Sequence, residues 1–457
     1  MTERRDFIKK SLVGTAGIAI GGMGFSAKSY GSIIGSNERI NLAVIGIRGQ
    51  GGGHINTYAS LKDDRNVRIK TLCDADEQFF KERADNAEKL TGYRPATEWD
   101  MRKVFDDKEI HAVSMAIPNH WHALGTIWAC QAGKHVYVEK PACHNVFEGR
   151  KMVEAARKYN VRVQVGFQNR SIPQVMDALR FLREGGIGEV YMARGLCLKP
   201  RDSFGIAKDS TPPATLHYER WLGPAQLRPY NEKRVHYNWH WHWDTGNGDT
   251  GNQGPHQFDI ARWGLGQNEH PAAIYSSGGI YGFTKRECSQ ETPDTQASVF
   301  KYANGQIFEF ETRGAFTNGE GNLNIKIGNI FYGTEGYLEI NGSTWKAWRR
   351  REKDSFAGSD KPAAEKPVDP TFRAAPGGSE HYANFLDSIR SGKDEDLNCD
   401  IQEGFMSSAL PHLANISYQL SREVHFMGSH EKFANDPEAD MMLTRNYRPP
   451  YTIGEQI

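Results

Sequence analysis

The first patterned segments of the chain are short apolar runs, each followed by a turn or a polar cluster. Runs at 40–45, 67–73, 111–117 and 135–138 have the length and the β-favouring composition of buried strands. A glycine-rich turn follows the first run, and a segment with helical character follows that turn. Strands that alternate with helices predict a parallel sheet covered by helices, a Rossmann domain at 38–165.

The pattern changes from residue 166 onward to longer alternating runs. Residues 297–313 form two such runs around Asn304 and Gly305, a pair typical of a type I′ hairpin turn. A second hairpin is expected over 325–340. The sequence therefore predicts a second domain of another kind, with paired neighbouring strands.

Helical periodicity returns near the C-terminal end of the chain. It is found at 381–389 and again at 403–420, and the second helix is expected to pack between the domains. A loop without periodicity is expected at 362–376, where proline and alanine are frequent. The fold class is therefore α/β, with the Rossmann domain followed by an α+β domain at 166–425 and a C-terminal tail at 426–457.

The first 35 residues have the organisation of an export signal. A charged start leads into a weakly apolar, glycine-rich stretch that is too short for a membrane span, and small residues follow. Arg4 and Arg5 followed by Phe7 resemble a twin-arginine signal. We therefore expect the twin-arginine export machinery to carry the folded chain to the periplasm, without stable membrane insertion; a basic amphipathic terminus is the alternative.

The glycine-rich turn after the first run has the composition of a phosphate-binding loop. In the fingerprint G-x-G-x-x-G, Gly46 fills the first position and Gly51 the third, whereas Arg48 stands at the second. Gly49 and Gly52 can restore the close approach of the backbone to a pyrophosphate, and Arg48 adds a cation there. A flexible loop is the alternative interpretation.

Asp74 follows the second run directly. A carboxylate at this place accepts hydrogen bonds from the adenosine ribose hydroxyls and repels a 2′-phosphate, so NAD is expected rather than NADP. Asp74 could instead be the N-cap of a helix that begins at Ala75.

Polar clusters follow the third and fourth runs. The first reads P-N-H-W-H from Pro118 to His122, and the second reads E-K-P from Glu139 to Pro141. Ligands of parallel sheets bind beyond the carboxyl ends of the strands, so both clusters should meet in one crevice.

Five segments in this order resemble the Gfo/Idh/MocA family of glucose-fructose oxidoreductases and inositol dehydrogenases. They are VIG with its glycine-rich turn, CD, IPNHWH, AGKHVYVEKP and GFQNRSIP, and the resemblance covers most of the chain after residue 38. It implies that the second domain contains an open, mostly antiparallel sheet whose outer face often serves oligomer contacts. A homo-oligomer, dimer or tetramer, is therefore expected.

The resemblance also implies roles for particular residues. Lys140 would lie near the nicotinamide and polarise or deprotonate the reacting hydroxyl. Further residues expected around the cofactor are Pro118, Asn119, His122, Glu139 and Asn169. Arg170 is expected at the substrate. Chemistry agrees for the lysine, because removing hydride from an alcohol needs a base that a partly desolvated amine can provide. A salt-bridged surface lysine is the alternative.

The stretch from 237 to 259 is dense in aromatic and imidazole side chains. Tryptophans alternate with His240 and His242, so a strand would present one indole face and one imidazole face. Trp239, His240 and His242 are therefore expected to contact a sugar, although a half-buried strand shows the same alternation.

Further along, the segment N-Q-G-P-H resembles the part of the family that carries an Asp and, four residues later, a His. His256 occupies the His position, but Asn252 stands where the Asp is expected. An amide cannot ionise, so proton transfer falls to His256 or Lys140, and both His256 and Asn252 are expected at the substrate. A capping or core histidine is the alternative for His256.

A metal site in this stretch is a further possibility, because six possible ligands fall within 21 residues: His236, His240, His242, Asp244, Asp249 and His256. His240 and His242 could share a strand face and bind zinc or manganese. Tryptophans separate these histidines, however, and the resembling family needs no metal, so none is expected.

Composition narrows the range of partners. Lys and Arg together number 56, as do Asp and Glu, so the formal charge of +0 gives no field for nucleic acid or anionic lipid. The six cysteines are far apart without a CxxC pair, so we interpret them as buried thiols.

These observations predict an NAD-dependent oxidoreductase acting on a secondary hydroxyl of a small carbohydrate or polyol. An exported enzyme would need tightly bound NAD, because NAD is scarce outside the cytoplasm. One alternative is an NAD-dependent glycosidase or lyase that works through a transient 3-keto sugar without net redox change. Another is a non-catalytic sugar-binding protein in which NAD is structural.

Overall fold

The structure, a computed structural model, describes residues 39–342, 344–350, 352–359 and 378–457. The expected export signal and the expected loop at 362–376 lie outside the described residues. Among the described residues, no helix combines the length and apolar character that a membrane crossing requires.

The first domain contains the predicted parallel sheet. In the described residues six strands pair in the order β3-β2-β1-β4-β5-β6. Their bounds are β1 Ile40–Ile45, β2 Val67–Cys73, β3 Ala96–Glu98, β4 Ala112–Met115, β5 His135–Glu139 and β6 Val163–Gly166. Strand order reverses between β1 and β4, which is where doubly wound sheets bind their ligands.

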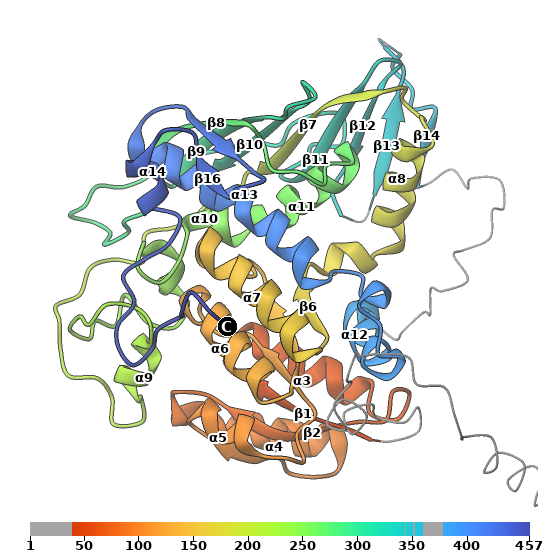
Figure 1. Cartoon of the computed structure of the whole chain (residues 1–457). Helices are drawn as coiled ribbons and strands as arrows, with labels where there is room; N and C mark the ends of the chain where they lie inside the picture. Colours follow the sequence, from red (N-terminus) through yellow and green to blue (C-terminus); the bar gives the residue numbers. More distant parts are fainter. Residues whose placement is uncertain (1–38, 343, 351, 360–377) are drawn as a thin grey trace, which may run out of the picture. The chain divides into compact units, whose positions relative to one another are not determined.

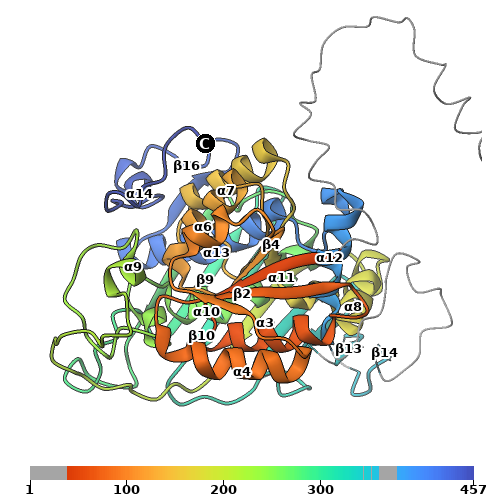
Figure 2. The ribbon, with the colours of Figure 1, turned by 90° about the horizontal axis from the view of Figure 1, so that it is seen from below.

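Helices cover both faces of this sheet (Figure 2). The helices are α3 Gln50–Ser60, the 3-10 helix η1 Glu77–Phe79, α4 Phe80–Thr91, α5 Met101–Asp106, α6 Asn119–Gln131 and α7 Val146–Tyr159. A late segment, α12 Glu380–Ser391, joins the α3 face, where Phe385 and Leu386 pack in one cluster with Leu42 and Val44. The first domain is therefore completed by residues far along the chain.

The second domain contains the predicted open sheet (Figure 1). In the described residues it has ten strands in the order β14-β13-β12-β11-β7-β10-β9-β8-β15-β16, in which β7 and β10 run parallel and the other neighbours antiparallel. The strands are β7 Val190–Cys197, β8 Ala273–Gly279, β9 Thr295–Lys301, β10 Ile307–Arg313, β11 Ile327–Gly333, β12 Tyr337–Ile340, β13 Trp345–Trp348, β14 Ala357–Gly358, β15 Val424–Met427 and β16 Lys432–Phe433.

The helices of the second half include the long α13, which contacts both the sheet and α7 of the first domain, as predicted. They are η2 Gln168–Ser171, α8 Pro173–Arg183, α9 Tyr218–Leu222, η3 Asn238–Trp241, α10 Gly248–Asn252, α11 Gly254–Leu265, η5 Asp394–Asp396, α13 Ile401–Leu420 and α14 Pro437–Met441.

Both predicted hairpins form, but the turn of the first differs from the prediction. Strands β9 and β10 pair antiparallel, as do β11 and β12. In the first turn Gly305 has a φ of 89°, whereas Asn304 is not among the residues with positive φ. A type I′ turn requires positive φ at both central residues, so this prediction was wrong. The positive φ falls on glycine, where it costs least.

The segment expected to be a C-terminal tail, residues 426–457, is joined to the second sheet. Strand β15 begins at Val424 and pairs with β8, so a boundary at residue 425 would cut through a strand. All six cysteines lie in the described residues, where each is buried and free, which confirms their interpretation as buried thiols.

Candidate active site

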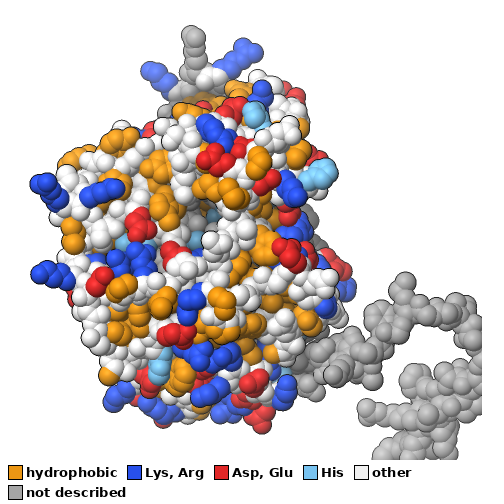
Figure 3. All heavy atoms as spheres, turned by 60° about the vertical axis from the view of Figure 1, so that its left-hand side comes forward, with side chains coloured by type: hydrophobic (Ala, Val, Ile, Leu, Met, Phe, Trp, Pro, Cys, Tyr) orange, Lys and Arg blue, Asp and Glu red, His pale blue; other side chains and the backbone are white. Residues whose placement is uncertain are grey.

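A cavity of about 450 Å³ lies at the carboxyl ends of β1, β2, β4 and β5. Figure 3 shows a face of the molecule that is hollowed near its centre, and basic and acidic side chains are mixed over that face. The polar clusters that follow these strands line the cavity together, as the strand-end argument predicts. The sequence-predicted residues that line it are Gly46, Arg48, Gly49, Asp74, Pro118, Asn119, His122, Glu139, Lys140, Trp239, His240, Asn252 and His256.

Five of the predicted residues do not line this cavity: Gly51, Gly52, Asn169, Arg170 and His242. The first two lie behind the glycine loop, where Gly51 contacts the Gly46 carbonyl and Gly52 lies against the guanidinium of Arg83. Asn169 lines a neighbouring cavity instead.

Arg170 and His242 are both buried beside carboxylates of the second half of the chain. Arg170 Nε and Nη2 each donate to a carboxylate oxygen of Asp259 at 2.8 Å. The Nδ1 atom of His242 lies 3.2 Å from Glu291 Oε1. Both side chains are at most 8% exposed, so packing, together with the ion pair to Asp259 in the case of Arg170, accounts for their positions outside the cavity lining.

The prediction of a strand around Trp239 was wrong. Residues Asn238–Trp241 form η3, so the alternation of indole and imidazole does not produce two faces. Trp239 and His240 instead stack on each other with ring centroids 3.6 Å apart, and both line the cavity. A short 3-10 turn places side chains three residues apart on one side, which alternation alone cannot reveal.

The metal candidates of this stretch are likewise dispersed. Asp249 pairs with Arg201, His242 with Glu291, and His236 with Asp76. The described residues contain no group of three His, Cys, Asp or Glu side chains that could hold a metal ion.

The glycine loop has the form of a pyrophosphate cradle. A Cβ on Gly46, whose φ is +79°, would lie 2.5 Å from the Ala116 carbonyl oxygen, and one on Gly51 would lie 1.7 Å from that of Gly46. Gly49 has no atom within 4 Å of such a Cβ, and no side chain caps the N-terminus of α3. Backbone N–H groups of an uncapped helix start are therefore available to an anion, which fits a dinucleotide.

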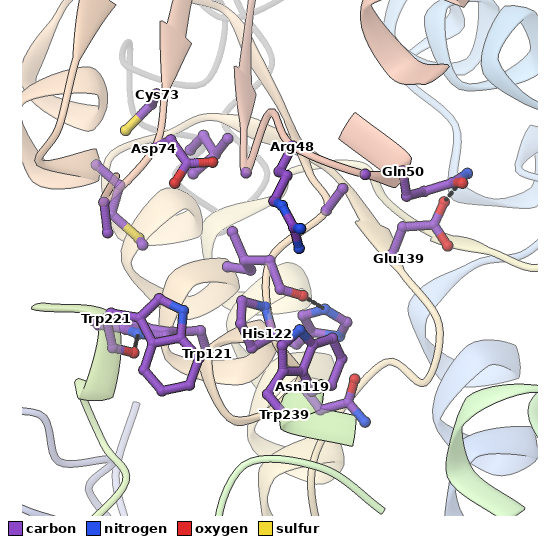
Figure 4. A pocket seen from close by; sticks show the side chains of 18 of the residues that line it. Arg48, Gln50, Cys73, Asp74, Asn119, Trp121, His122, Glu139, Trp221 and Trp239 are labelled. Atoms are coloured by element: carbon purple, nitrogen blue, oxygen red, sulfur yellow. Dashed lines mark hydrogen bonds between the residues drawn. The ribbon is translucent and has the colours of Figure 1, made fainter. Parts of the chain in front are cut away.

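Asp74 lies at the end of β2 beside this loop, and Figure 4 shows it near Arg48. Its carboxylate accepts hydrogen bonds from the N–H groups of Ile47 at 2.9 Å and Asp76 at 3.0 Å. Burial raises the pKa of Asp74 to about 6, against the lowering effect of these two bonds. A carboxylate has further acceptor sites for ribose hydroxyls. The N-cap alternative was wrong, because Asp76 caps η1.

Lys140 extends from the end of β5 toward α10. Its Nζ donates to the backbone carbonyl of Asn252 at 2.9 Å, and the Asn252 Oδ1 is 3.4 Å away. Burial lowers the pKa of Lys140, the charges of Glu139 and Asp249 oppose this, and Arg201 adds to the lowering. An amine with a lowered pKa is a better supply of free base near neutrality.

Asp249, on α10, is a carboxylate close to the lysine that the motif comparison missed. Arg201 binds it through two hydrogen bonds of 2.8 and 2.6 Å, and Asn252 Nδ2 lies 3.4 Å from its Oδ1. The amide of Asn252 thus separates Lys140 from the nearest acid of α10.

His256 lies in the first turn of the adjoining helix α11 and shares the cavity with Lys140. Burial, with the nearby charge of Lys140, lowers the pKa of His256 to about 4. Its imidazole is therefore neutral at pH 7 and a weak base, and its Nδ1 is buried without a hydrogen-bond partner in the described residues. Of the two candidate bases, Lys140 is the better placed.

Glu139 and His122 hold the strand ends in position. Glu139 Oε1 accepts hydrogen bonds from Gln168 at 2.8 Å and lies 3.0 Å from His54 Nε2. Burial alone would raise the pKa of Glu139, but the bond and charge of His54 outweigh it and lower that pKa to about 2. The two ring nitrogens of His122 lie 2.6 and 2.8 Å from backbone carbonyls of Pro141 and Ile117, so they brace the backbone.

A segment of the second domain, residues 215–240, crosses the end of the cavity at Asp74, where the adenosine of NAD is expected; we call this segment the strap. His217 N–H donates to the Ala75 carbonyl at 2.9 Å, and His217 Nε2 lies 2.6 Å from Glu77 Oε1. The His217 ring stacks on Trp99 at 4.1 Å. The strap therefore closes over the loop that follows Asp74.

Aromatic side chains line the same end of the cavity (Figure 4). Trp121 Nε1 donates a hydrogen bond to the backbone carbonyl of Trp221 at 3.0 Å, and the ring centroids of Trp121 and Tyr451 are 5.5 Å apart. The lining residues missed by sequence reasoning include Gln50, Trp99, Met101, Arg102, Trp121, Trp128, Gln168, Arg220, Trp221, His236, Tyr237 and Tyr451. Trp121 stood inside the P-N-H-W-H motif, whereas residues 215–236 of the strap and Tyr451 carried no motif.

The bond between Lys140 and Asn252 predicts a pH effect. In Asn252→Asp a carboxylate would face Nζ and raise the pKa of Lys140 by about 1–3 units. Since the free amine is the base, the rising limb of kcat/KM should move to higher pH by that amount, and activity at pH 7 should fall. The pH profile of kcat/KM measures this.

Asn252→Leu is the matched control for this prediction, because it removes the amide without adding charge. Its rising limb should not move to higher pH. If the two variants shift alike, the charge at position 252 does not govern the titration of Lys140.

This fold and cavity define a two-domain oxidoreductase with an NAD-binding Rossmann domain. Residues 40–167 match the family described as "Oxidoreductase family, NAD-binding Rossmann fold", and residues 205–277 and 357–453 match its C-terminal alpha/beta domain. The chain belongs to this Gfo/Idh/MocA oxidoreductase family.

Two characterised classes occur among its relatives. Levoglucosan dehydrogenase of Pseudarthrobacter phenanthrenivorans is 26% identical over 325 residues, which is 66% of this chain and 74% of that protein. A glycosyl hydrolase family 109 protein of Shewanella baltica is 24% identical over 204 residues, 41% of this chain and 44% of that protein.

Solved structures share the fold. Levoglucosan dehydrogenase in complex with NADH and levoglucosan superposes with a TM-score of 0.62 at 20% identity, over 85% of this chain and 99% of that one. The WlbA dehydrogenase from Bordetella pertussis, in complex with NADH and UDP-GlcNAcA, gives 0.61 at 18% identity over the same shares, 85% and 99%.

Proposed function

We propose that the protein oxidises a secondary hydroxyl of a neutral carbohydrate or polyol with NAD as the hydride acceptor. The observation that carries this proposal is that Lys140, Asn252 and His256 line one cavity together with the glycine loop. The similarity to a levoglucosan dehydrogenase supports a carbohydrate as the substrate.

Four side chains of this cavity have a task in such a reaction. NAD, when bound, supplies the nicotinamide carbon that accepts the hydride. Lys140 Nζ, held by the Asn252 carbonyl, removes the proton from the reacting hydroxyl. The neutral imidazole of His256 binds a neighbouring hydroxyl. The stacked rings of Trp239 and His240 offer a flat surface for the apolar face of a sugar.

The experiment is a screen of neutral sugars and polyols against the purified, NAD-loaded protein. Formation of NADH together with a keto sugar, identified by mass spectrometry, is the expected result. If no neutral sugar or polyol yields a keto product while NAD is bound, the proposed reaction is wrong.

A second candidate function is redox-neutral glycoside cleavage through a transient 3-keto sugar. The similarity to glycosyl hydrolase family 109 proteins favours it, and it uses the same Lys140 and NAD. Release of the aglycone without net NADH would identify this reaction. Exchange of solvent deuterium into the carbon beside the transient ketone would accompany it, whereas simple oxidation gives neither result.

We also propose that NAD is held too tightly to exchange, as an exported enzyme requires. The strap supports this, because it joins the two domains across the adenosine end. His217→Ala removes the ring that stacks on Trp99 and pairs with Glu77. Release of NAD should then be on the order of tenfold faster, as one partly exposed ion pair and one ring stack are lost.

Retained nucleotide after timed dialysis measures this effect. His425→Ala is the control, since His425 is an exposed histidine on β15 outside the cavity lining. Equal loss of NAD from both variants and the parent would show that the strap does not retain the cofactor.

Export and assembly complete the proposal. We propose that the twin-arginine machinery recognises Arg4 and Arg5 and that the folded chain acts in the periplasm. We also propose a homo-oligomer that forms through the outer face of the second sheet, where Tyr191, Tyr275 and Val299 are exposed. Cell fractionation and sedimentation of the purified protein test these two points.

A further inference from the structure

A second cavity of about 290 Å³ adjoins the first. It lies between η2, one side of α11 and the ends of β11 and β12. His256 and Gln168 line both cavities, so they form a shared wall. The residues that line the second cavity are Gln168, Asn169, Gln253, His256, Gln257, Ile260, Ile327, Gly328, Asn341 and Gly342.

The lining of this second cavity is polar but uncharged. Its polar side chains are amides and one imidazole, and none of its lining residues in the described part of the chain is Lys, Arg, Asp, Glu, Trp, Tyr or Phe. Phosphate and carboxylate groups bind to cations, and flat aromatic groups bind to aromatic rings, so neither kind of ligand suits it. A neutral ligand with many hydroxyl groups does, because amides donate to and accept from hydroxyls.

Several of these amides have hydrogen-bonding capacity to spare. The amide groups of Gln253 and Gln257 make one mutual contact, at 3.5 Å, the limit of a hydrogen bond. The Asn169 side chain makes no hydrogen bond within the described part of the chain. Each amide carries two N–H donors and an acceptor oxygen, so a hydroxylated ligand would find partners on two walls, η2 and α11.

The start of helix α11 lies between the two cavities. His256 faces both, whereas Gln253, Gln257 and Ile260 line only the second. A ligand beside Lys140 that extends past His256 therefore enters the second cavity directly.

We propose that the second cavity is a sugar-binding subsite, so that the substrate is a neutral glycoside or oligosaccharide with a hydroxylated unit attached to the reacting ring. The reacting ring lies beside Lys140 and the attached unit beside Asn169, Gln253 and Gln257. This inference rests on the proposed function, from which it takes the position of the reacting ring.

Binding to the NAD-loaded protein, measured by calorimetry, tests the subsite apart from turnover. The probes are glucose, methyl glucosides, 4-nitrophenyl glucosides, cellobiose, maltose, lactose and trehalose. We expect at least one disaccharide to bind on the order of tenfold more tightly than its monosaccharide, since several hydrogen bonds are added. The 4-nitrophenyl glucosides should not show this gain.

Gln253→Leu and Asn169→Leu should remove the gain while monosaccharide binding stays unchanged. Gln131→Leu is the matched control, because this exposed amide at the end of α6 lies outside both cavities. Thermal melts show that each variant is folded, and the two substitutions report separately, so the failure of one to fold leaves the other as the test.

The outcomes separate the subsite from the reaction. Equal affinity for mono- and disaccharides, a gain with the aryl glucosides instead, a gain that survives both leucine variants, or no binding by any probe would overturn the subsite. Tighter disaccharide binding that depends on Gln253 or Asn169, without any keto product or released sugar, would uphold the subsite and overturn the proposed function.

Discussion

Replacing Lys140 by methionine is expected to lower turnover by about 10²- to 10⁴-fold, the usual contribution of a general base. Methionine keeps most of the side-chain length but cannot take a proton. Nothing in the glycine loop or around Asp74 changes, so NAD should remain bound. Single-turnover formation of the keto sugar, together with the amount of nucleotide released on denaturation, measures both effects.

Lys89→Met is the control for this variant, because Lys89 is exposed in the last turn of α4, away from the cavity. It should turn over like the parent. Unchanged turnover in Lys140→Met would remove the lysine from the reaction. If neither the parent protein nor any variant converts a sugar, the protein is better described as a non-catalytic sugar-binding protein in which NAD is structural.

Gly51→Ala is expected to weaken the binding of NAD by about 10- to 100-fold. The new Cβ would lie 1.7 Å from the Gly46 carbonyl oxygen, so the backbone of the loop has to move. Overpacking of this kind costs about 1–3 kcal/mol, and each 1.4 kcal/mol changes an affinity tenfold. Titration of the NAD-free protein with NAD, followed by fluorescence, measures the change.

Gly53→Ala, two residues along the same helix, is the matched control. A Cβ there meets no atom within 4 Å, and the residue is exposed in α3. Alanine should raise helix stability by about 1 kcal/mol and leave the affinity for NAD unchanged. Equal affinities in the two variants would mean that the close approach of Gly51 to Gly46 does not shape the cofactor site.

Sequence reasoning predicted the parts of the fold that depend on local patterns of hydrophobic and polar residues. Strands β1 and β2 have the bounds of the runs that predicted them. β1 is almost continuously apolar, as buried parallel strands usually are, whereas β2 alternates Arg68 and Lys70 with buried residues. Asp74 and Lys140 were predicted at the crevice because each directly follows such a strand. Strand ends in a parallel sheet meet at one edge, so position along the chain is enough to place them.

The parts that failed depend on partners far away in the sequence. Arg170 was assigned to the substrate by motif position, but Asp259, 89 residues later, takes up its guanidinium. Residues 215–236 of the strap and Tyr451 have no periodicity that distinguishes them from loops, and their role depends on the domain they reach. His240 was expected on a strand because alternation is shared by strands and by short turns of aromatic residues.

Helix α12 has a consequence for the order in which the molecule can be assembled. Its Tyr382, Phe385 and Leu386 cover one face of a sheet whose last strand ends at Gly166. The part of that face beneath α12 stays uncovered on a nascent chain until more than 200 further residues have left the ribosome. The nucleotide-binding domain can therefore complete its folding only when synthesis is almost finished. A fragment that ends after β6 would expose hydrophobic surface and self-associate.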